Sequence, residues 1–441
     1  MRRAVSIIWI IIFLSTCVHA EEMIDENALF GDPEEVITTG IVDTAPEEED
    51  KKTMGVSGEA QSVFEYTRKK YEETDGDDEI STYIYGNLFF DVRLKKGTKL
   101  FADLQTGYDS QLEESAIDLK EIFLDFNVKD RVYLRTGKQV LQWGRCYLWN
   151  PSDLINIEKE SFTERIGSRE GAYGVKMHIP FGTKYNIYSF IDSGNSDESD
   201  QLAVAAKFEF LIGKTEMAFS AWNKKGFNPV YAYDLSSRIF RLDIVAEAAF
   251  SKGDNNYKIR EENGILSKYK VDDEWVSRVC LGIGKSYDFM DVNDRISINM
   301  EFYYNQTGYT ENIFADTATY AYAESVTVTE NGSPVPVTKV RGTKKDFLID
   351  SDLYDMNNIS RYYSALFINV SKFIISDMSL NLNLLGNFND SSYILTTGVS
   401  YEDINDFSVG FDIYSYIGNK NREYTFMNNE YTTQLTVGVL F

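Results

Sequence analysis

Residues 83–94 read YIYGNLFFDVRL, and the alternation within this stretch decides the fold. Leu88 and Phe90 fall on one face of an extended strand, whereas Asn87 and Asp91 fall on the other, because consecutive strand side chains point to opposite faces. The strand therefore has one apolar side and one polar, partly aromatic side. The same alternation recurs in 294–305 (DRISINMEFYYN) and 408–415 (SVGFDIYS).

Segments with this period of two fill the chain from residue 54 onward, and we count about 18 of them. Their expected starting points are Val56, Ser81, Thr98, Ala116, Arg131, Glu170, Thr183, Gln201, Lys214, Pro229, Ile239, Asp273, Asn293, Arg361, Met378, Ser391, Asp406 and Glu430. Short connections alternate with mostly longer ones. That alternation is typical of an outer-membrane barrel, whose short turns face the periplasm and whose loops face outward. We therefore predict an all-β, transmembrane, antiparallel up-and-down β-barrel over residues 54–441.

A soluble all-β protein with one wet face is the alternative to a barrel. Such a sheet would need a second layer to cover its apolar face, and the sequence offers no further set of elements to supply one. Closing the sheet on itself removes both edges and pairs every backbone group, as lipid requires. The composition agrees with a sheet, since 29 Tyr and 28 Phe accompany only 7 Pro.

The N-terminal residues carry the features of an export signal. Residues 1–20, MRRAVSIIWIIIFLSTCVHA, place two arginines before an apolar run and end in a small-x-small site. We predict a signal peptide that is cleaved after Ala20, in preference to a lipoprotein signal with modification at Cys17. Residues 21–53 are acidic and irregular, and we predict a flexible periplasmic leader. A segment of this leader that enters the pore or binds a partner is the alternative.

The end of the sequence resembles the terminal strand of Gram-negative outer-membrane proteins. Residues 430–441 read EYTTQLTVGVLF, with alternating apolar residues before Phe441. In those proteins the final aromatic residue is read by the barrel assembly machinery. The resemblance implies that Phe441 is an assembly signal and that the assembly machinery is a partner, along with outer-membrane lipid and lipopolysaccharide.

A second resemblance involves residues 135–156, RTGKQVLQWGRCYLWNPSDLIN. This stretch is similar to a segment of porin-like outer-membrane families, including relatives of alginate-export barrels. The resemblance implies a pore-forming or export barrel and gives no named substrate. In general porins the third outer loop folds into the barrel, and residues 143–169 occupy that place in the order of strands.

The lumen of an 18-strand barrel is too wide for wall side chains to fill. We therefore predict that the third loop folds inward and narrows the pore, with the Asn-Pro-Ser-Asp turn reversing the inserted chain. The expected constriction residues are Trp143, Arg145, Tyr147, Trp149, Asn150, Asp153 and Glu158. An external loop whose aromatic residues cap the barrel mouth is the alternative.

Strand parity also assigns charged residues to the inner wall. The expected pore-wall residues are Arg93, Arg131, Arg135, Arg241, Arg278, Arg295, Asp91, Asp125 and Glu301. Opposed charges across a narrow passage orient polar solutes and set ion preference. For any single residue, pairing with a neighbouring charge is the alternative role.

These observations predict an outer-membrane channel for passive diffusion or export of small polar or charged solutes. The formal net charge of −25 argues against nucleic-acid binding. Nothing in the sequence indicates a cofactor or a metal site, and the oligomeric state and any pairing of Cys146 with Cys280 stay open.

We expect that the protein is not an enzyme, because His178 is the one histidine that follows the signal peptide. An adhesin or surface antigen is the other alternative, since residues 306–360 form a long loop with a hairpin signal at 331–332.

Overall fold

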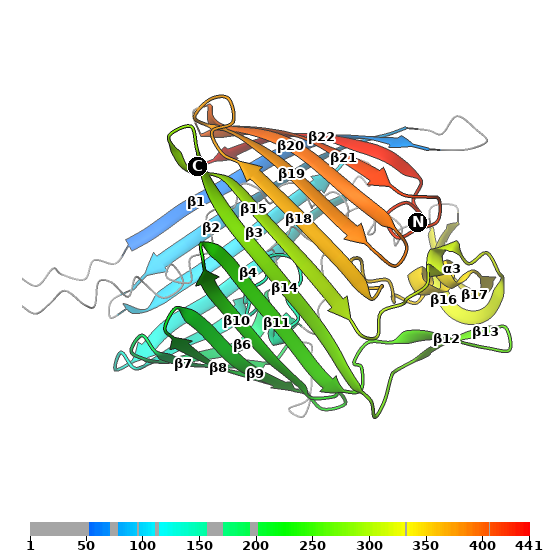
Figure 1. Ribbon diagram of the computed structural model, residues 1–441, viewed down its shortest axis with the longest axis horizontal. Coiled ribbons are helices and arrows are strands. Elements are labelled where there is room, and N and C mark those ends of the chain that lie inside the picture. The colour runs from blue at the N-terminus through cyan, green and yellow to red at the C-terminus, as the bar shows by residue number, and fades with distance from the viewer. Residues whose placement is uncertain are drawn as a thin grey trace, which may run out of the picture.

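The computed structural model describes residues 53–70, 78–94, 97–110, 114–156, 171–194, 202–330, 333–404 and 406–441. Within them, 18 strands pair antiparallel in chain order, and β22 closes on β1 to complete a barrel (Figure 1). The barrel strands are β1 (Thr53–Lys69), β2 (Glu79–Arg93), β3 (Lys99–Asp109), β4 (Glu114–Val128), β5 (Val132–Gln139), β6 (Ala172–Phe181), β7 (Tyr185–Asp192), β8 (Ala203–Ile212), β9 (Thr215–Asn223), β10 (Val230–Ile239), β11 (Leu242–Lys252), β14 (Trp275–Phe289), β15 (Val292–Asn305), β18 (Tyr362–Val370), β19 (Met378–Asn387), β20 (Ser392–Ile404), β21 (Phe407–Ile417) and β22 (Asn429–Leu440).

The predicted up-and-down barrel is confirmed. Each expected strand is present, and the largest difference between an expected and an observed first residue is three positions. These largest differences occur at β1, which begins at Thr53 instead of Val56, and at β11, which begins at Leu242 instead of Ile239. The predicted signal peptide and nearly all of the predicted leader, residues 1–52, lie outside the described residues.

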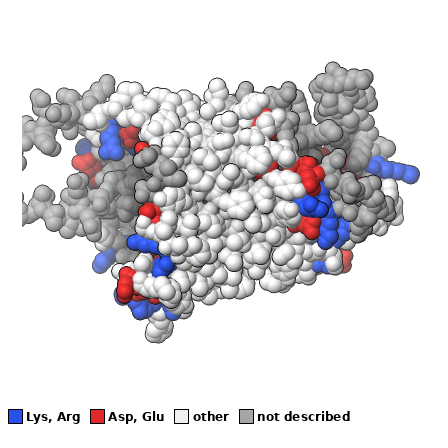
Figure 2. Space-filling model, turned by 90° about the horizontal axis from the view of Figure 1, so that it is seen from above, with Lys and Arg blue, Asp and Glu red and all other residues white. Residues whose placement is uncertain are grey.

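The two faces of the barrel wall differ as the alternation predicts. In β2, Ile80 and Ile84 are 58% and 53% exposed, whereas Ser81 and Tyr83 are each 5% exposed. The exposed set points outward. Figure 2 shows the resulting surface as a broad, largely uncharged band, with Lys, Arg, Asp and Glu gathered toward its two ends. An apolar band between charged rims is what a bilayer requires of a barrel.

Spin labels at neighbouring positions of β2 test this orientation. Labels at Leu88 and Phe90 are expected to report contact with lipid, and labels at Asn87 and Asp91 contact with water, because successive side chains face opposite sides of the wall. The measurement is the accessibility of each label to oxygen and to a polar relaxation agent. Equal accessibility of the two sets would contradict a membrane-spanning wall.

Short turns close one end of the barrel. In three of them two consecutive residues adopt positive φ, namely Lys129–Asp130, Phe240–Arg241 and Met290–Asp291. Such pairs form hairpin turns whose twist matches that of the flanking strands. Two of the expected pore-wall residues lie in these turns. Arg131 and Arg241 are at the rim of the barrel instead of on its inner wall.

The longer connections build a second, four-stranded sheet at the opposite end (Figure 1). Its strands are β12 (Lys258–Glu262), β13 (Ile265–Tyr269), β16 (Tyr320–Glu330) and β17 (Ser333–Gly342), with α3 (Lys344–Asp350) beside them. The hairpin expected at 331–332 is confirmed by the pairing of Glu330 with Ser333. Within the described residues, no helix is long and apolar enough to cross a bilayer.

Phe441 completes the seam between β22 and β1. Its backbone N–H donates to the Gly58 carbonyl at 2.9 Å, and the Gly58 N–H donates to the Phe441 carbonyl at 2.7 Å. A Cβ atom at position 58 would lie 2.5 Å from Cζ of Phe441, so the aromatic ring lies directly over the glycine. Only a residue without a side chain leaves room for this contact.

Deleting Phe441 is expected to lower the amount of assembled barrel severalfold, because the deletion removes two hydrogen bonds and the ring that covers Gly58. The measurement is the heat-modifiable, folded fraction in outer-membrane preparations. F441Y, which keeps the ring, serves as the matched control and should assemble normally. Normal levels of the truncated protein would exclude an assembly role for this residue.

Candidate functional site

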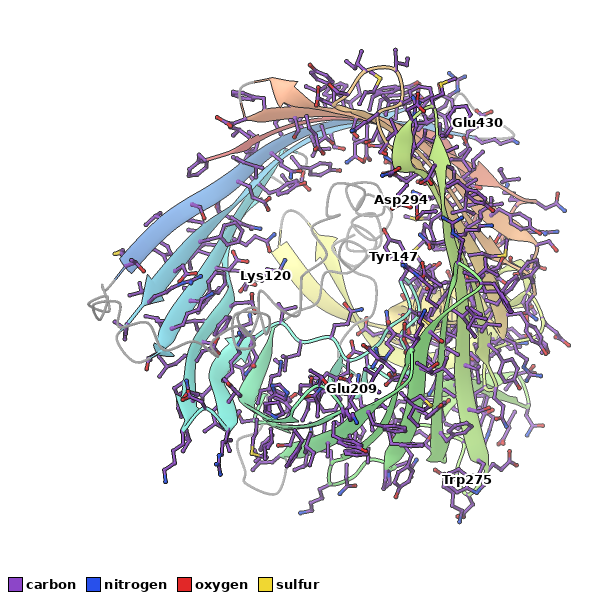
Figure 3. All side chains as sticks on the ribbon, turned by 60° about the vertical axis from the view of Figure 1, so that its left-hand side comes forward. Lys120, Tyr147, Glu209, Trp275, Asp294 and Glu430 are labelled. Atoms are coloured by element: carbon purple, nitrogen blue, oxygen red, sulfur yellow. The ribbon has the colours of Figure 1, made fainter. Side chains whose placement is uncertain are left out.

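The candidate site is built on residues 141–156, which we call the inner segment. The inner segment leaves β5 and ends in the 3-10 turn η4 (Leu154–Asn156). Figure 3 shows Tyr147 inside the ring of strands, together with Lys120 and Glu209 of the wall. Residues 157–170 lie outside the described residues, Glu158 among them, so inward folding of the whole third loop stays a prediction.

Glu301 of β15 is a buried acceptor for the backbone of the inner segment. The N–H groups of Leu148 and Trp149 donate to Glu301 Oε2 at 2.9 and 3.3 Å, and the N–H of Tyr147 donates to Oε1. The side chain is only 2% exposed. Burying a carboxylate is costly, and charge-assisted hydrogen bonds from backbone N–H groups offset this cost.

Glu247 of β11 holds the inner segment in the same way. Its Oε1 atom accepts the N–H groups of Arg145 at 2.5 Å and of Cys146 at 2.6 Å. Its Oε2 atom accepts the N–H of Ser152 at 3.0 Å and the hydroxyl of Ser152 at 2.7 Å. Two wall carboxylates therefore orient six backbone N–H groups, which keeps the inner segment against β11 and β15.

Arg145 is the charged centre of the site. Its guanidinium donates to Glu209 at 2.8 Å and to Glu216 at 2.7 Å, and it also donates to Asp234. Lys207 of β8 is the second cation, 3.5 Å from Asp234 and donating at 2.8 Å to the Trp143 carbonyl. Three carboxylates thus surround one arginine and one lysine, which leaves this part of the interior net negative.

Aromatic side chains pack the inner segment onto the wall. The rings of Trp149 and Tyr303 stack with centroids 5.4 Å apart, and Trp149 Nε1 donates to the Asn357 carbonyl at 2.9 Å. Tyr147 contacts the Phe367 ring edge-on at 4.7 Å and is 44% exposed. Of these aromatic residues, Tyr147 therefore presents the most surface to the interior.

Three expected constriction residues shape the turn of the inner segment. Asp153 is buried, and its carboxylate accepts the Trp143 N–H at 3.3 Å. The Asp153 N–H donates to the Asn150 carbonyl at 3.0 Å, which closes the Asn-Pro-Ser-Asp turn. Trp143 itself is buried in an apolar cluster with Leu154 and Trp222. Asp153 and Trp143 are thus buried residues that hold the turn together, whereas Asn150 is only partly buried.

Outer loops close over the Trp149 end of the inner segment. Glu423, from the connection after β21, accepts the Asn357 N–H at 2.8 Å, the Tyr363 hydroxyl at 2.8 Å and the Asn387 side-chain amide at 2.6 Å. Burial raises the pKa of Glu423 to about 8, against the opposing effect of these hydrogen bonds. Because Asn357 also accepts from Trp149, the outer loops and the inner segment form one hydrogen-bonded network.

Most expected wall charges are paired in the described residues. Arg135 forms a two-pronged pair with Asp125, at 2.6 and 2.8 Å, and its guanidinium lies 3.7 Å from the centre of the Phe123 ring. Asp91 pairs with Lys99 at 3.1 Å. For these residues the pairing interpretation holds, and the wall here presents little net charge.

The other expected wall charges lie near the ends of the barrel. Arg278 pairs with Asp254 at 2.8 Å, and Arg295 donates to the Lys372 carbonyl at 2.8 Å. The Arg93 side chain is 71% exposed, 3.7 Å from Asp91. Within the described residues, none of these three arginines pairs or hydrogen-bonds with the inner segment, which separates them from the site around Arg145.

Sequence reasoning missed Glu209 and Asp234, which pair with Arg145, and Lys207, which pairs with Asp234. The signal was present, because AVAAKFEFLI at 203–212 alternates and puts Lys207 and Glu209 on the same face as buried Ala203 and Ala205. The same parity argument applies to Asp234 in VYAYDLSS. Strand parity could have assigned these three residues to the inner face, but it could not have shown that Glu209 and Asp234 pair with Arg145.

The site does not resemble a hydrolase centre. His178 hydrogen-bonds Asn186 at 3.1 Å and stacks on Tyr188 with ring centres 4.4 Å apart. A histidine that activates a nucleophile needs that nucleophile within hydrogen-bond reach. The contacts of His178 with Asn186 and Tyr188 give it a packing role in the wall.

No family model matches the sequence, and no curated protein matches it. Solved structures do match. OccAB1 of Acinetobacter baumannii has a TM-score of 0.53 at 9% identity, covering 89% of this chain and 99% of that one. Pseudomonas aeruginosa OccK2 (OpdF), solved in complex with glucuronate, has a TM-score of 0.52 at 10% identity, covering 88% and 98%. OccK8 (OprE) of P. aeruginosa has a TM-score of 0.51 at 9% identity, again covering 88% and 98%.

These similar proteins are outer-membrane porins, and the described chain has their fold, a closed 18-strand barrel. At such low identity the likeness concerns the fold, so solute and site residues must be argued from this chain itself.

Proposed function

We propose that this protein is a porin-like channel of the outer membrane, through which small polar or charged solutes diffuse passively. The observation that carries this proposal is the inner segment, which two buried wall carboxylates hold inside a closed 18-strand barrel. A wide barrel without inserted chain would leave a large aqueous passage. An ordered segment inside the wall gives the passage a defined shape and charge.

Charge supports a channel that discriminates among solutes. Arg145 and Lys207 lie among Glu209, Glu216 and Asp234, of which Asp234 is buried and Glu216 is half-exposed. Fixed charges in a narrow, low-dielectric passage act strongly on a passing ion. Export of a solute is compatible with the same geometry, since diffusion through an open barrel has no fixed direction.

Conductance of the refolded protein in a planar bilayer tests the proposal. Stepwise current increases of uniform size are expected, and a salt gradient should give a nonzero reversal potential. A folded, heat-modifiable barrel that gives no current steps would overturn the proposal. Refolding must be verified on the same sample, because an unfolded chain would also be silent.

Attachment to an external surface is a second candidate function, favoured by one observation. The sheet of β12, β13, β16 and β17 forms from connections beyond the barrel strands, and α3 packs beside it. Removing residues 320–342 should abolish binding to a target surface if the sheet is an adhesive element. The same deletion should leave the conductance close to that of the full protein, so the two functions are separable.

A further inference from the structure

Two cysteines that are far apart in the sequence meet behind the inner segment. Cys146 belongs to the inner segment, Cys280 belongs to β14, and both are buried thiols in this structure. Their Sγ atoms and one carboxylate oxygen of Glu301 all lie within 4.8 Å of one another. Both cysteines belong to the apolar cluster that contains Trp149 and Tyr303. One thiol is thus on the candidate constriction and the other on the barrel wall.

We propose that Cys146 and Cys280 form a disulfide in the exported protein, which fastens the inner segment covalently to β14. The proposal rests on the outer-membrane location given under the proposed function, because disulfides persist in the oxidising periplasm and at the cell surface. The third cysteine, Cys17, lies in the predicted signal peptide. The two cysteines of the predicted mature chain are therefore the two that meet.

The oxidant is the disulfide of a thiol–disulfide oxidoreductase, acting before the inner segment is fully packed. One cysteine thiolate attacks that disulfide, which forms a mixed disulfide and releases one thiolate of the oxidoreductase. The second cysteine thiolate then attacks the sulfur of the first cysteine and releases the other oxidoreductase thiolate. Two protons and two electrons leave the cysteines, and the oxidoreductase is reduced to its dithiol.

A metal ion is the competing occupant, since two thiolates and a carboxylate are common zinc ligands. The contacts of Glu301 argue against it. Both of its oxygens already accept N–H groups from the inner segment, at 2.9 Å in the case of Leu148, so binding a metal would disturb these hydrogen bonds. A disulfide carries no charge and leaves the backbone hydrogen bonds of Glu301 in place, which suits a buried position beside two carboxylates.

The bond would limit how far the inner segment can move. A cross-link between Cys146 and Cys280 closes a long stretch of chain and removes the states in which the inner segment is far from β14. Reduction of the bond is therefore expected to increase fluctuations of the open-channel current. The carboxylates Glu247 and Glu301 would still hold the segment, so the mean conductance should change less than the current noise.

Thiol counting on protein extracted from outer membranes tests the proposal. The sample is quenched in acid, denatured and treated with a polyethylene glycol maleimide, with and without prior reduction. We expect no adduct without reduction, two adducts after it, and an intact mass lower by two hydrogen atoms before it. C280S, the matched control, should give one adduct without reduction.

Two free thiols in quenched outer-membrane protein would overturn the disulfide while leaving the channel intact. Thiols that react only after treatment with a chelator, together with one metal ion per chain, would overturn it in favour of a metal site. Failure of the protein to reach the outer membrane would instead overturn the proposed function. C146S/C280S keeps the proposal testable if a single serine variant assembles poorly, since its current noise should match that of the reduced protein.

Discussion

Replacing Glu301 with glutamine is expected to release the inner segment and to raise the single-channel conductance severalfold. The amide has almost the same shape, but it is uncharged and retains only one acceptor oxygen, and its NH₂ group faces backbone N–H donors. The loss of hydrogen bonds to a charged group amounts to about 3 kcal/mol, enough to favour detached states of the segment. E247Q should act in the same direction, because Glu247 orients the other half of the turn.

The measurement is the current step in a planar bilayer, recorded with and without a reductant so that a disulfide cannot mask the effect. D412N is the matched control. Asp412 is an inner-face carboxylate of β21, and it pairs in register with Gln434 of β22. Its neutralisation removes the same charge without loosening the segment. An E301Q channel that is folded and conducts like the original would show that the inner segment does not limit the passage.

Replacing Arg145 with glutamine is expected to shift the channel strongly toward cations. Lys207 would then be the remaining cation beside three carboxylates, those of Glu209, Glu216 and Asp234. In a narrow passage, one unit charge changes the energy of a passing ion by about 1 kcal/mol or more, and this energy corresponds to a selectivity change of about fivefold. The reversal potential under a salt gradient measures the change.

Arg238 provides the matched control for Arg145. Arg238 pairs with Asp243 at 2.5 Å, but both side chains are largely exposed, at 72% and 47%, and lie at the turn between β10 and β11. R238Q removes the same charge outside the candidate constriction and should leave the reversal potential nearly unchanged. R145K separates charge from geometry, since it keeps the charge and loses the forked contacts. Equal shifts of the reversal potential for R145Q and R238Q would place Arg145 away from the narrowest part of the channel.

The barrel was predictable because its rule is local. A period of two over about ten residues fixes which side chains face lipid, and lipid tolerates no other arrangement of the backbone. Glu301 could be assigned to the inner face by this rule alone. That it accepts three N–H groups could not, because the donors come from the inner segment, and only the folded chain brings them to β15.

The sequence analysis did not predict the hairpin of β12 and β13, and the reason is different. Asn263 and Gly264 both adopt positive φ, at 53° and 76°, and Asn-Gly between short extended runs is a strong hairpin signal. The polar residues around it resemble those of a loop, so the alternation alone predicts no strand between residues 251 and 271. By contrast, Asn331-Gly332 was recognised, because flanking valines and threonines gave a clear strand pattern.

The seam between β1 and β22 has a consequence for how the molecule is made. Thr67 and Thr432 are hydrogen-bonded neighbours at 2.9 Å across the seam, although 365 positions separate them along the chain. Pairing of such distant segments is slow, because loop-closure entropy is lost before any contact forms. Until β22 arrives, β1 presents an unpaired edge that can recruit foreign strands. The barrel therefore spends the interval between synthesis and closure in its most aggregation-prone state, and shielding of the β1 edge during that interval should determine the yield.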